Sequence, residues 1–200
     1  MFIKVCGINN LENFHFLENQ EKISHIGFIF YDKSPRFSQI SLPLLPKTKK
    51  RVGVFVNSTF AEIIEISKKF SLDSIQLHGN ESPELCEKLA ENFEVIKVFQ
   101  IDENFDFKST EGFENKGNYF LFDTKTENYG GSGKQFPWQL LEKYCGKTPF
   151  ILSGGINPSS AEEIKKISHS KFAGIDLNSV FEILPGEKNQ ALISTFLNEL

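Results

Sequence analysis

The first stretch that could carry chemistry is FIKVCGIN, at residues 2–9. It has the composition of a buried strand, yet Lys4 and Cys6 stand two positions apart within it. Because side chains alternate along a strand, the ammonium and the thiol point to one side, and Ile3 and Val5 point to the other. A cationic neighbour favours the thiolate form of a cysteine. A lysine and a thiol that point together into a protein interior therefore require a reason.

Other segments could hold an anionic group. LSGGINPSS contains Gly154 and Gly155, whose bare backbone N–H groups suit a phosphate at the start of a helix. DLNSVFEILPG contains Asn178 and Ser179 beside a possible short helical turn. Arg36, in YDKSPR, could clamp a carboxylate or a phosphate with two N–H groups. The alternatives are that the glycines only permit a tight turn and that the arginine is a solvated loop residue.

Eight short apolar runs recur along the chain and predict strands. They begin at residues 2, 25, 51, 74, 94, 119, 148 and 172. Helical patterns lie between several of them, at residues 58–70, after Ser82 and Pro83, after Asn157 and Pro158, and near the C-terminus. The proline-containing segment FSQISLPLLPKTKK predicts only a short or irregular helix. YGGSGKQF, residues 129–136, lacks the spacing of a nucleotide-binding P-loop and predicts a mobile lid.

Strands that alternate with helices are typical of a parallel α/β fold. The simplest closed version is a (β/α)8 barrel with eight parallel strands, and we expect one such domain over residues 1–200. An open, doubly wound sheet is the alternative. No G-x-G-x-x-G motif follows the first strand, which weakens a dinucleotide-binding interpretation.

A barrel would bring the polar strand positions to one cavity. The outward face of each strand lies beneath helices and must be apolar, whereas the inward face can be polar near the carboxyl ends, where such enzymes carry out chemistry. The positions that alternation turns inward are Lys4, Cys6, Gln76, His78, Lys97, Asp123, Asp176 and Asn178. The two lysines and two aspartates could instead form a structural ion-pair network. Cys6 and Asp123 fit that alternative less well, because both lie near the carboxyl ends of their strands.

Composition and charge limit the possible partners. The chain has 200 residues and a formal net charge of −4, which disfavours nucleic acid or an anionic membrane as the main partner. Its three cysteines show no CxxC spacing, which indicates neither a disulfide framework nor a zinc site. No signal-peptide pattern is present, and no apolar run approaches the roughly 20 residues of a membrane helix. We expect a cytoplasmic monomer or homodimer that binds a small phosphorylated molecule.

Several segments together resemble the phosphoribosylanthranilate isomerase family of tryptophan biosynthesis. They are KVCGIN, GFIFYDKSPR, VGVFVN, IQLHGNE, LFDTK with YGGSGK, SGGINP and GIDLNSVFE with PGEKN, and they occur in the family's order over nearly the whole chain. GFIFYDKSPR, QLHG and YGGSGK are specific to the family rather than to the fold. One departure is Val180, where the family often has glycine. Because a β-branched residue avoids positive φ, this departure bears on the geometry of the phosphate loop.

The resemblance implies a (β/α)8 barrel that needs no cofactor and no metal. It implies an Amadori rearrangement of N-(5-phosphoribosyl)anthranilate to 1-(2-carboxyphenylamino)-1-deoxyribulose 5-phosphate. In this sequence it implies that Cys6 is the general base, that Asp123 is the general acid, and that Arg36 holds the anthranilate end or orients the reacting groups. The residues that we expect to contact the substrate are Lys4, Arg36, Gln76, His78, Gly154, Gly155, Asp176, Asn178 and Ser179.

Acid–base chemistry near neutral pH requires both pKa values to move toward neutrality. We expect Lys4 to lower the pKa of Cys6 and burial to raise the pKa of Asp123. Two rival functions remain at this point. One is a sister barrel enzyme, a sugar-phosphate isomerase or epimerase that acts without anthranilate. The other is a non-catalytic phosphosugar-binding protein, which would keep the glycines but have no need for Cys6 and Asp123.

Overall fold

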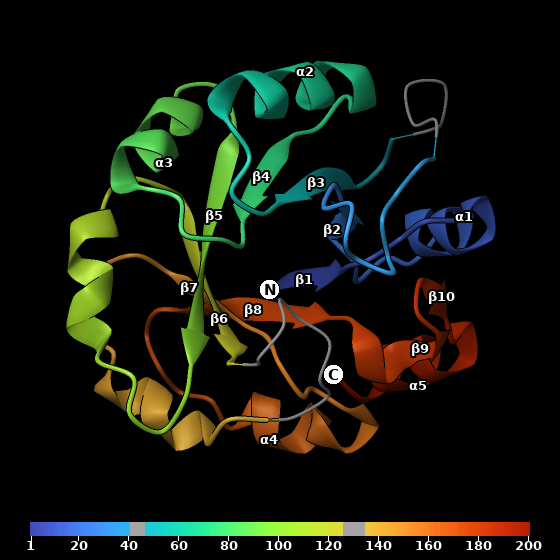
Figure 1. The fold of residues 1–200 in the computed structure, drawn as a ribbon. Helices are drawn as coiled ribbons and strands as arrows, with labels where there is room; N and C mark the ends of the chain where they lie inside the picture. The colour runs from blue at the N-terminus through green and yellow to red at the C-terminus, as the bar shows by residue number, and fades with distance from the viewer. Residues whose placement is uncertain (41–46, 126–134) are drawn as a thin grey trace.

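Eight parallel strands close into a barrel in sequence order in the computed structural model, which describes residues 1–40, 47–125 and 135–200 (Figure 1). The strands are β1 (Phe2–Val5), β2 (His25–Ile29), β3 (Lys50–Phe55), β4 (Ser74–Leu77), β5 (Glu94–Ile101), β6 (Tyr119–Thr124), β7 (Phe150–Leu152) and β8 (Phe172–Leu177). β1 pairs with both β2 and β8, which closes the sheet. The predicted (β/α)8 barrel is confirmed, and the open sheet is wrong.

Helices surround the barrel on the outside (Figure 1). The α-helices are α1 (Leu11–Glu18), α2 (Phe60–Phe70), α3 (Pro83–Ala90), α4 (Ala161–Lys165) and α5 (Gln190–Glu199). The 3-10 helices are η1 (Phe107–Phe113), η2 (Trp138–Lys143), η3 (Pro158–Ser160) and η4 (Ser179–Phe181). The connections after β5 and β6 thus use 3-10 helices in the part of the chain described here. The irregular helix expected after β2 would include residues 41–46, which lie outside the described residues.

The helix starts follow the capping signals in the sequence. The Ser82 hydroxyl accepts a hydrogen bond from the Leu85 N–H, and Pro83 occupies the first helical position of α3. Thr59 and Glu62 form a reciprocal capping box at the start of α2. These local signals confirm the predicted helices at residues 58–70 and after Ser82.

Two apolar layers cover the two faces of the barrel strands. The strand residues in the outer layer, which helices cover, include Ile3, Val5, Ile75, Leu77, Phe120, Phe122, Ile175 and Leu177. The inner layer fills the barrel interior with Phe2, Val52, Ile96, Val98, Leu121 and Ile151. The outward assignments made from alternation in β1, β4, β6 and β8 are therefore confirmed.

Strand β5 turns the opposite face inward from the one expected. We expected Ile96 and Val98 outward and Lys97 inward, but Ile96 and Val98 belong to the inner layer. The register agrees, because Lys97 is the partner of the outward-facing Leu77. The Lys97 ammonium turns to the loop after β4, where it lies 2.8 Å from a carboxylate oxygen of Glu81. A lysine paired in this way can lie outside the barrel cavity.

A short antiparallel hairpin follows β8 and was not expected from the sequence. It consists of β9 (Glu182–Leu184) and β10 (Glu187–Lys188), and it leads into α5. In Figure 1 it lies at the carboxyl end of β8, beside α5. None of the helices in the described ranges is long and apolar enough to cross a membrane.

Candidate active site

Lys4 and Asp176 form a buried ion pair inside the barrel. They are register partners in β1 and β8, and the Lys4 Nζ lies 2.8 Å from the Asp176 Oδ1. Burial alone would lower the pKa of Lys4, but Asp176 and Cys6 outweigh it, so the pKa is raised. Lys4 therefore keeps its positive charge next to the Cys6 thiol, but the negative charge of Asp176 beside it acts to raise the pKa of that thiol. Alternation in β1 and β8 predicted that both side chains point inward, whereas their ion pair corresponds to the alternative of a structural ion-pair network.

The Cys6 thiol occupies space that Gly27 of β2 leaves open. A Cβ added at Gly27 would lie only 2.8 Å from the Cys6 Sγ. Burial raises the pKa of this thiol, although the charges of Lys4 and Lys188 act to lower it. The expected fall of the Cys6 pKa toward neutrality is therefore wrong. The reason is that desolvation of a thiolate in the barrel outweighs two neighbouring ammonium groups.

Asp123 lies near the carboxyl end of β6. Its Oδ1 accepts a hydrogen bond from the Thr124 N–H at 2.9 Å. Burial, with the charge of Asp176 as the second cause, raises the pKa of Asp123 to about 7. The hydrogen bond from Thr124 and the charge of Lys4 oppose this rise without cancelling it. Asp123 can therefore hold a proton near neutral pH, as its burial led us to expect.

Gln76 and His78 continue the polar cluster from β4 toward Asp123. The Gln76 Nε2 and the His78 Nδ1 are 3.3 Å apart, and the His78 Nε2 lies 3.5 Å from the Asp123 Oδ2. Burial, together with the charges of Lys4 and Lys97, lowers the pKa of His78 to about 4. His78 is thus a neutral imidazole at physiological pH. A neutral neighbour does not stabilise the Asp123 carboxylate by charge, which leaves the Asp123 pKa high.

The loop after β7 uses glycines to lie close to Asp123. Gly154 and Gly155 have φ values of +79° and +68°. A Cβ added at Gly154 would collide with Thr124 and lie 2.8 Å from the Asp123 Oδ1. Glycine at residue 154 therefore lets the loop lie close to the candidate acid. This role is separate from any binding of an anion by the same loop.

The loop after β8 places Asn178 and Ser179 at the start of η4. Ser179 is the first residue of this 3-10 helix, and Val180 follows it. Val180 is not among the non-glycine residues with positive φ, so the valine fits the loop without backbone strain. At Val180 the backbone thus has a conformation that does not require glycine.

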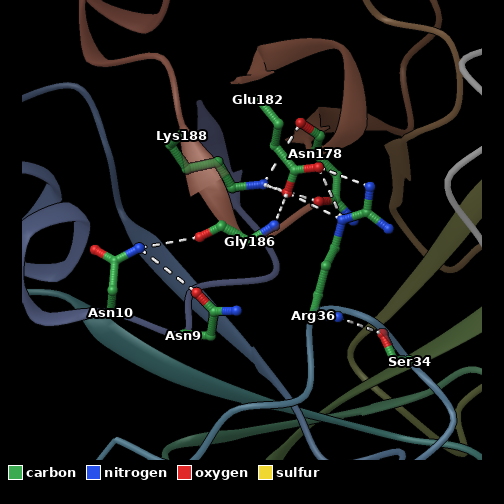
Figure 2. Close-up of polar contacts among 8 residues, drawn as sticks. All are labelled: Asn9, Asn10, Ser34, Arg36, Asn178, Glu182, Gly186 and Lys188. Carbon is green, nitrogen blue, oxygen red and sulfur yellow. Dashed lines mark hydrogen bonds and ion pairs between the residues drawn. The ribbon is translucent and has the colours of Figure 1, made fainter. Parts of the chain in front are cut away.

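Arg36 lies in a polar cluster with residues of the β9–β10 hairpin (Figure 2). Its Nε lies 2.9 Å from both carboxylate oxygens of Glu182, and its Nη2 lies 2.6 Å from the Glu182 Oε2. Lys188 donates to the same carboxylate at 2.7 Å and to the Asn178 Oδ1 at 2.9 Å. The solvated-loop alternative for Arg36 is wrong, because its side chain is only 12% exposed. The arginine does clamp a carboxylate, but this one belongs to the chain itself.

Sequence reasoning missed four residues that shape this end of the barrel. They are Gly27, Glu81, Glu182 and Lys188. Glu182 and Lys188 lie in VFEILPGEKN, which carried part of the family resemblance, so the segment was noted without a role for these side chains. Within the described ranges, no group of three histidine, cysteine, aspartate or glutamate side chains could hold a metal ion. Most of the predicted lid, at residues 129–134, lies outside the described residues.

A carboxyl group with a pKa of about 7 and a buried thiol thus lie near the carboxyl end of a closed parallel barrel. This combination places the chain among the (β/α)8-barrel enzymes that work by acid–base catalysis. The family model for N-(5'phosphoribosyl)anthranilate (PRA) isomerase matches residues 3–199. The chain belongs to this family.

Individual relatives agree with that assignment. The chain is 45% identical to an N-(5'-phosphoribosyl)anthranilate isomerase of Parabacteroides distasonis, with 100% of this chain and 93% of the relative covered. It is similar to the crystal structure of the Thermotoga maritima phosphoribosyl anthranilate isomerase, with a TM-score of 0.87, 35% identity and coverage of 100% and 98%. Another solved isomerase holds reduced 1-(o-carboxyphenylamino)-1-deoxyribulose 5-phosphate. It matches with a TM-score of 0.83, 30% identity and coverage of 100% and 97%.

Proposed function

We propose that this chain isomerises N-(5'-phosphoribosyl)anthranilate to 1-(2-carboxyphenylamino)-1-deoxyribulose 5-phosphate, an Amadori rearrangement in tryptophan biosynthesis. The observation that carries the proposal is the raised pKa of Asp123, at about 7, in a barrel of this family. A carboxyl group that keeps its proton near neutral pH is what opening of the ribose ring requires. We propose a single domain that acts in the cytoplasm as a monomer or a homodimer, with no need for a cofactor.

Asp123 would begin the reaction by giving its proton to the ring oxygen of the ribose. The C1–O bond then breaks, the ring opens, and the nitrogen becomes a protonated Schiff base. Cys6 would take the proton from C2, and the electron pair of that C–H bond would move to neutralise the nitrogen. The enolamine product then tautomerises to the ketone. The positive charge of the Schiff base favours loss of the thiol proton, and this offsets the raised pKa of Cys6.

The remaining candidate residues would hold the two ends of the substrate. Backbone N–H groups at Gly154, Gly155 and Ser179 lie in the loops after β7 and β8, where barrels of this class bind phosphate. Arg36 would face the anthranilate carboxylate. Gln76, His78, Asn178 and the Lys4–Asp176 pair would line the space between the two ends.

The first test is a fluorescence assay on freshly generated phosphoribosylanthranilate. We expect turnover in the wild type and a loss of at least about a hundredfold in kcat for Asp123→Asn and for Cys6→Ser. The matched control is Asp102→Asn, because Asp102 is an exposed aspartate just after β5 that pairs with the exposed Lys125. Turnover that survives in Cys6→Ser would contradict the assigned base. A wild type that binds product analogues without turnover would instead indicate a phosphosugar-binding protein.

A further inference from the structure

Glu182 is a buried carboxylate shared by two cations near the barrel mouth. Its side chain is 4% exposed, and it accepts three contacts from Arg36 at 2.6–2.9 Å. Its Oε1 also accepts hydrogen bonds from the Lys188 Nζ at 2.7 Å and from the Gly186 N–H at 3.1 Å. Such a carboxylate holds the guanidinium in one orientation, because both oxygens are already engaged.

Lys188 is the second cation, and its ammonium group is fully buried. It donates to the Glu182 Oε1, to the Asn178 Oδ1 at 2.9 Å and to the Asn178 carbonyl at 3.5 Å. Burial lowers the pKa of Lys188, while Glu182 and Cys6 act to raise it. Three oxygen acceptors around one ammonium suit its charged form. Lys188 therefore acts electrostatically on both the carboxylate and the candidate base.

The hairpin that carries these residues is anchored next to the catalytic strand. The Gly186 carbonyl accepts a hydrogen bond from the Asn10 Nδ2 at 3.1 Å, just after β1 (Figure 2). A Cβ added at Gly7, the residue after Cys6, would lie 2.9 Å from the Arg36 Cδ and 3.0 Å from the Asn178 Oδ1. The guanidinium, the ammonium and the thiol thus occupy one small region.

Formal charges in this cluster do not cancel. Arg36 and Lys188 contribute two positive charges and Glu182 one negative charge, which leaves one positive charge in excess. Glu182 occupies the Nε and Nη2 edge of the guanidinium. Within the described residues, no hydrogen bond or ion pair reaches the Arg36 Nη1. An excess charge with a free donor beside it is suited to an anionic ligand.

We propose that Glu182 and Lys188 are positioning residues for substrate selection. Glu182 holds Arg36 with its Nη1 group free, and Lys188 supplies the excess charge that makes this group selective for the carboxylate of the substrate. Without Lys188, the charge of Glu182 would cancel that of Arg36 and the preference for a carboxylate would weaken. This inference rests on the proposed function, because it assumes an anthranilate-type substrate.

The test compares two product analogues by titration calorimetry. One is reduced 1-(o-carboxyphenylamino)-1-deoxyribulose 5-phosphate, and the other is the same molecule without its carboxyl group. In the wild type we expect the carboxylated analogue to bind more tightly. In Lys188→Met we expect this preference to fall at least about tenfold, with a rise in KM that exceeds any fall in kcat. If Lys188 had a purely structural role, its loss would weaken the binding of both analogues equally and leave the ratio of their affinities unchanged.

A double variant separates charge from packing. Glu182→Gln with Lys188→Met restores the excess positive charge on Arg36, so we expect it to recover part of the preference lost in the single variant. The matched control is Lys97→Met, which removes the ammonium of another buried ion pair, with Glu81, and should leave the ratio unchanged. An unchanged ratio in Lys188→Met, or a further loss in the double variant, overturns the inference. A wild type that neither binds nor turns over these molecules would overturn the proposed function instead.

Discussion

The pKa of Asp123, the proposed acid, is lower than the pKa of Cys6, the proposed base. Their roles would favour the reverse order. The acid needs its proton, yet its pKa is about 7, whereas the base must lose its proton, yet burial raises its pKa. Between these two values most of the free enzyme carries a charged carboxylate and a neutral thiol. The active form, with the proton on Asp123 and none on Cys6, is a small fraction of the total. In the proposed mechanism, the positive Schiff base formed in the first step would favour the thiolate of Cys6.

The pH dependence of kcat/KM should follow from this order. We expect kcat/KM to rise with unit slope up to about pH 7, to level off, and to fall above the raised pKa of Cys6. The rise reflects the growing thiolate fraction while Asp123 is still protonated, and the plateau begins where Asp123 loses its proton. The measurement is a kcat/KM profile from pH 5 to 10.

The rate of Cys6 alkylation by iodoacetamide at each pH tests whether the fall in kcat/KM at high pH comes from this thiol. The experiment uses a Cys145→Ser background, because Cys145 is exposed and would react as well. Slow modification at pH 7 that accelerates above pH 9 fits the raised thiol pKa. A thiol that is already fully reactive at pH 7 would contradict the order of the two pKa values.

At the scale of single elements, β2 makes room for the candidate base because it has a glycine at residue 27. Gly27 leaves room for the Cys6 Sγ, and an added methyl group would lie 2.8 Å from it. We expect Gly27→Ala to displace the thiol and to lower kcat at least about tenfold. The control is Gly112→Ala in η1, where the nearest atom is 4.0 Å from the added Cβ. Equal kcat values in the two variants, with both folded, would contradict this role for Gly27.

Alternation along a strand predicted much of the site, and its failure has a physical cause. Lys4 stands between Ile3 and Val5, and Asp176 stands between two apolar residues of β8, so both could be assigned to the same cavity before the structure was known. In β5 each face mixes apolar and polar residues, because Glu94 and Gln100 share the face of Ile96 and Val98, and Lys97 alone was a misleading guide to the inward face. Its ammonium instead reaches past the strand end to Glu81, a loop residue that alternation does not describe.

The hairpin residues could not be predicted in this way at all. Arg36 and Glu182 are 146 positions apart in the sequence, and neither lies in a strand of the barrel. Strands of three and two residues are too short to show a side-chain period, so nothing in VFEILPGEKN indicates that its glutamate and lysine turn toward the same arginine. The sequence therefore predicts the barrel and the inward side chains of several strands, whereas the contacts between Arg36 and the hairpin require the folded structure.

The two ends of the barrel differ in how its charged groups affect stability. At the carboxyl end, burial raises the pKa of Asp123 to about 7, so its ionised form destabilises the fold. At the amino end, Glu94 accepts hydrogen bonds from Ser74 at 2.8 Å and from Lys50 at 2.7 Å, and it contacts His25 at 3.0 Å. Burial opposes this effect, yet these partners lower the pKa of Glu94 to about 2.

Substitution of the two carboxylates should therefore change the free energy of unfolding in opposite directions. The raised pKa of Asp123 means that its contribution to stability is complete below the unfolded pKa near 4 and is lost as the pH rises through about 7. Asp123→Asn should stabilise the fold at pH 8 by about 1–3 kcal/mol and have little effect at pH 4. The lowered pKa of Glu94 means that its contribution is present above the unfolded pKa and is lost as the pH falls toward 2. Glu94→Gln should destabilise the fold at pH 8 by about 1–3 kcal/mol, with a smaller effect at pH 3.

Urea unfolding of both variants and the wild type at pH 3, 4 and 8 measures these differences. A change for Asp123→Asn that is equal at pH 4 and pH 8 would contradict the raised pKa, and the thermodynamic argument for Asp123 as the proton donor would fail with it.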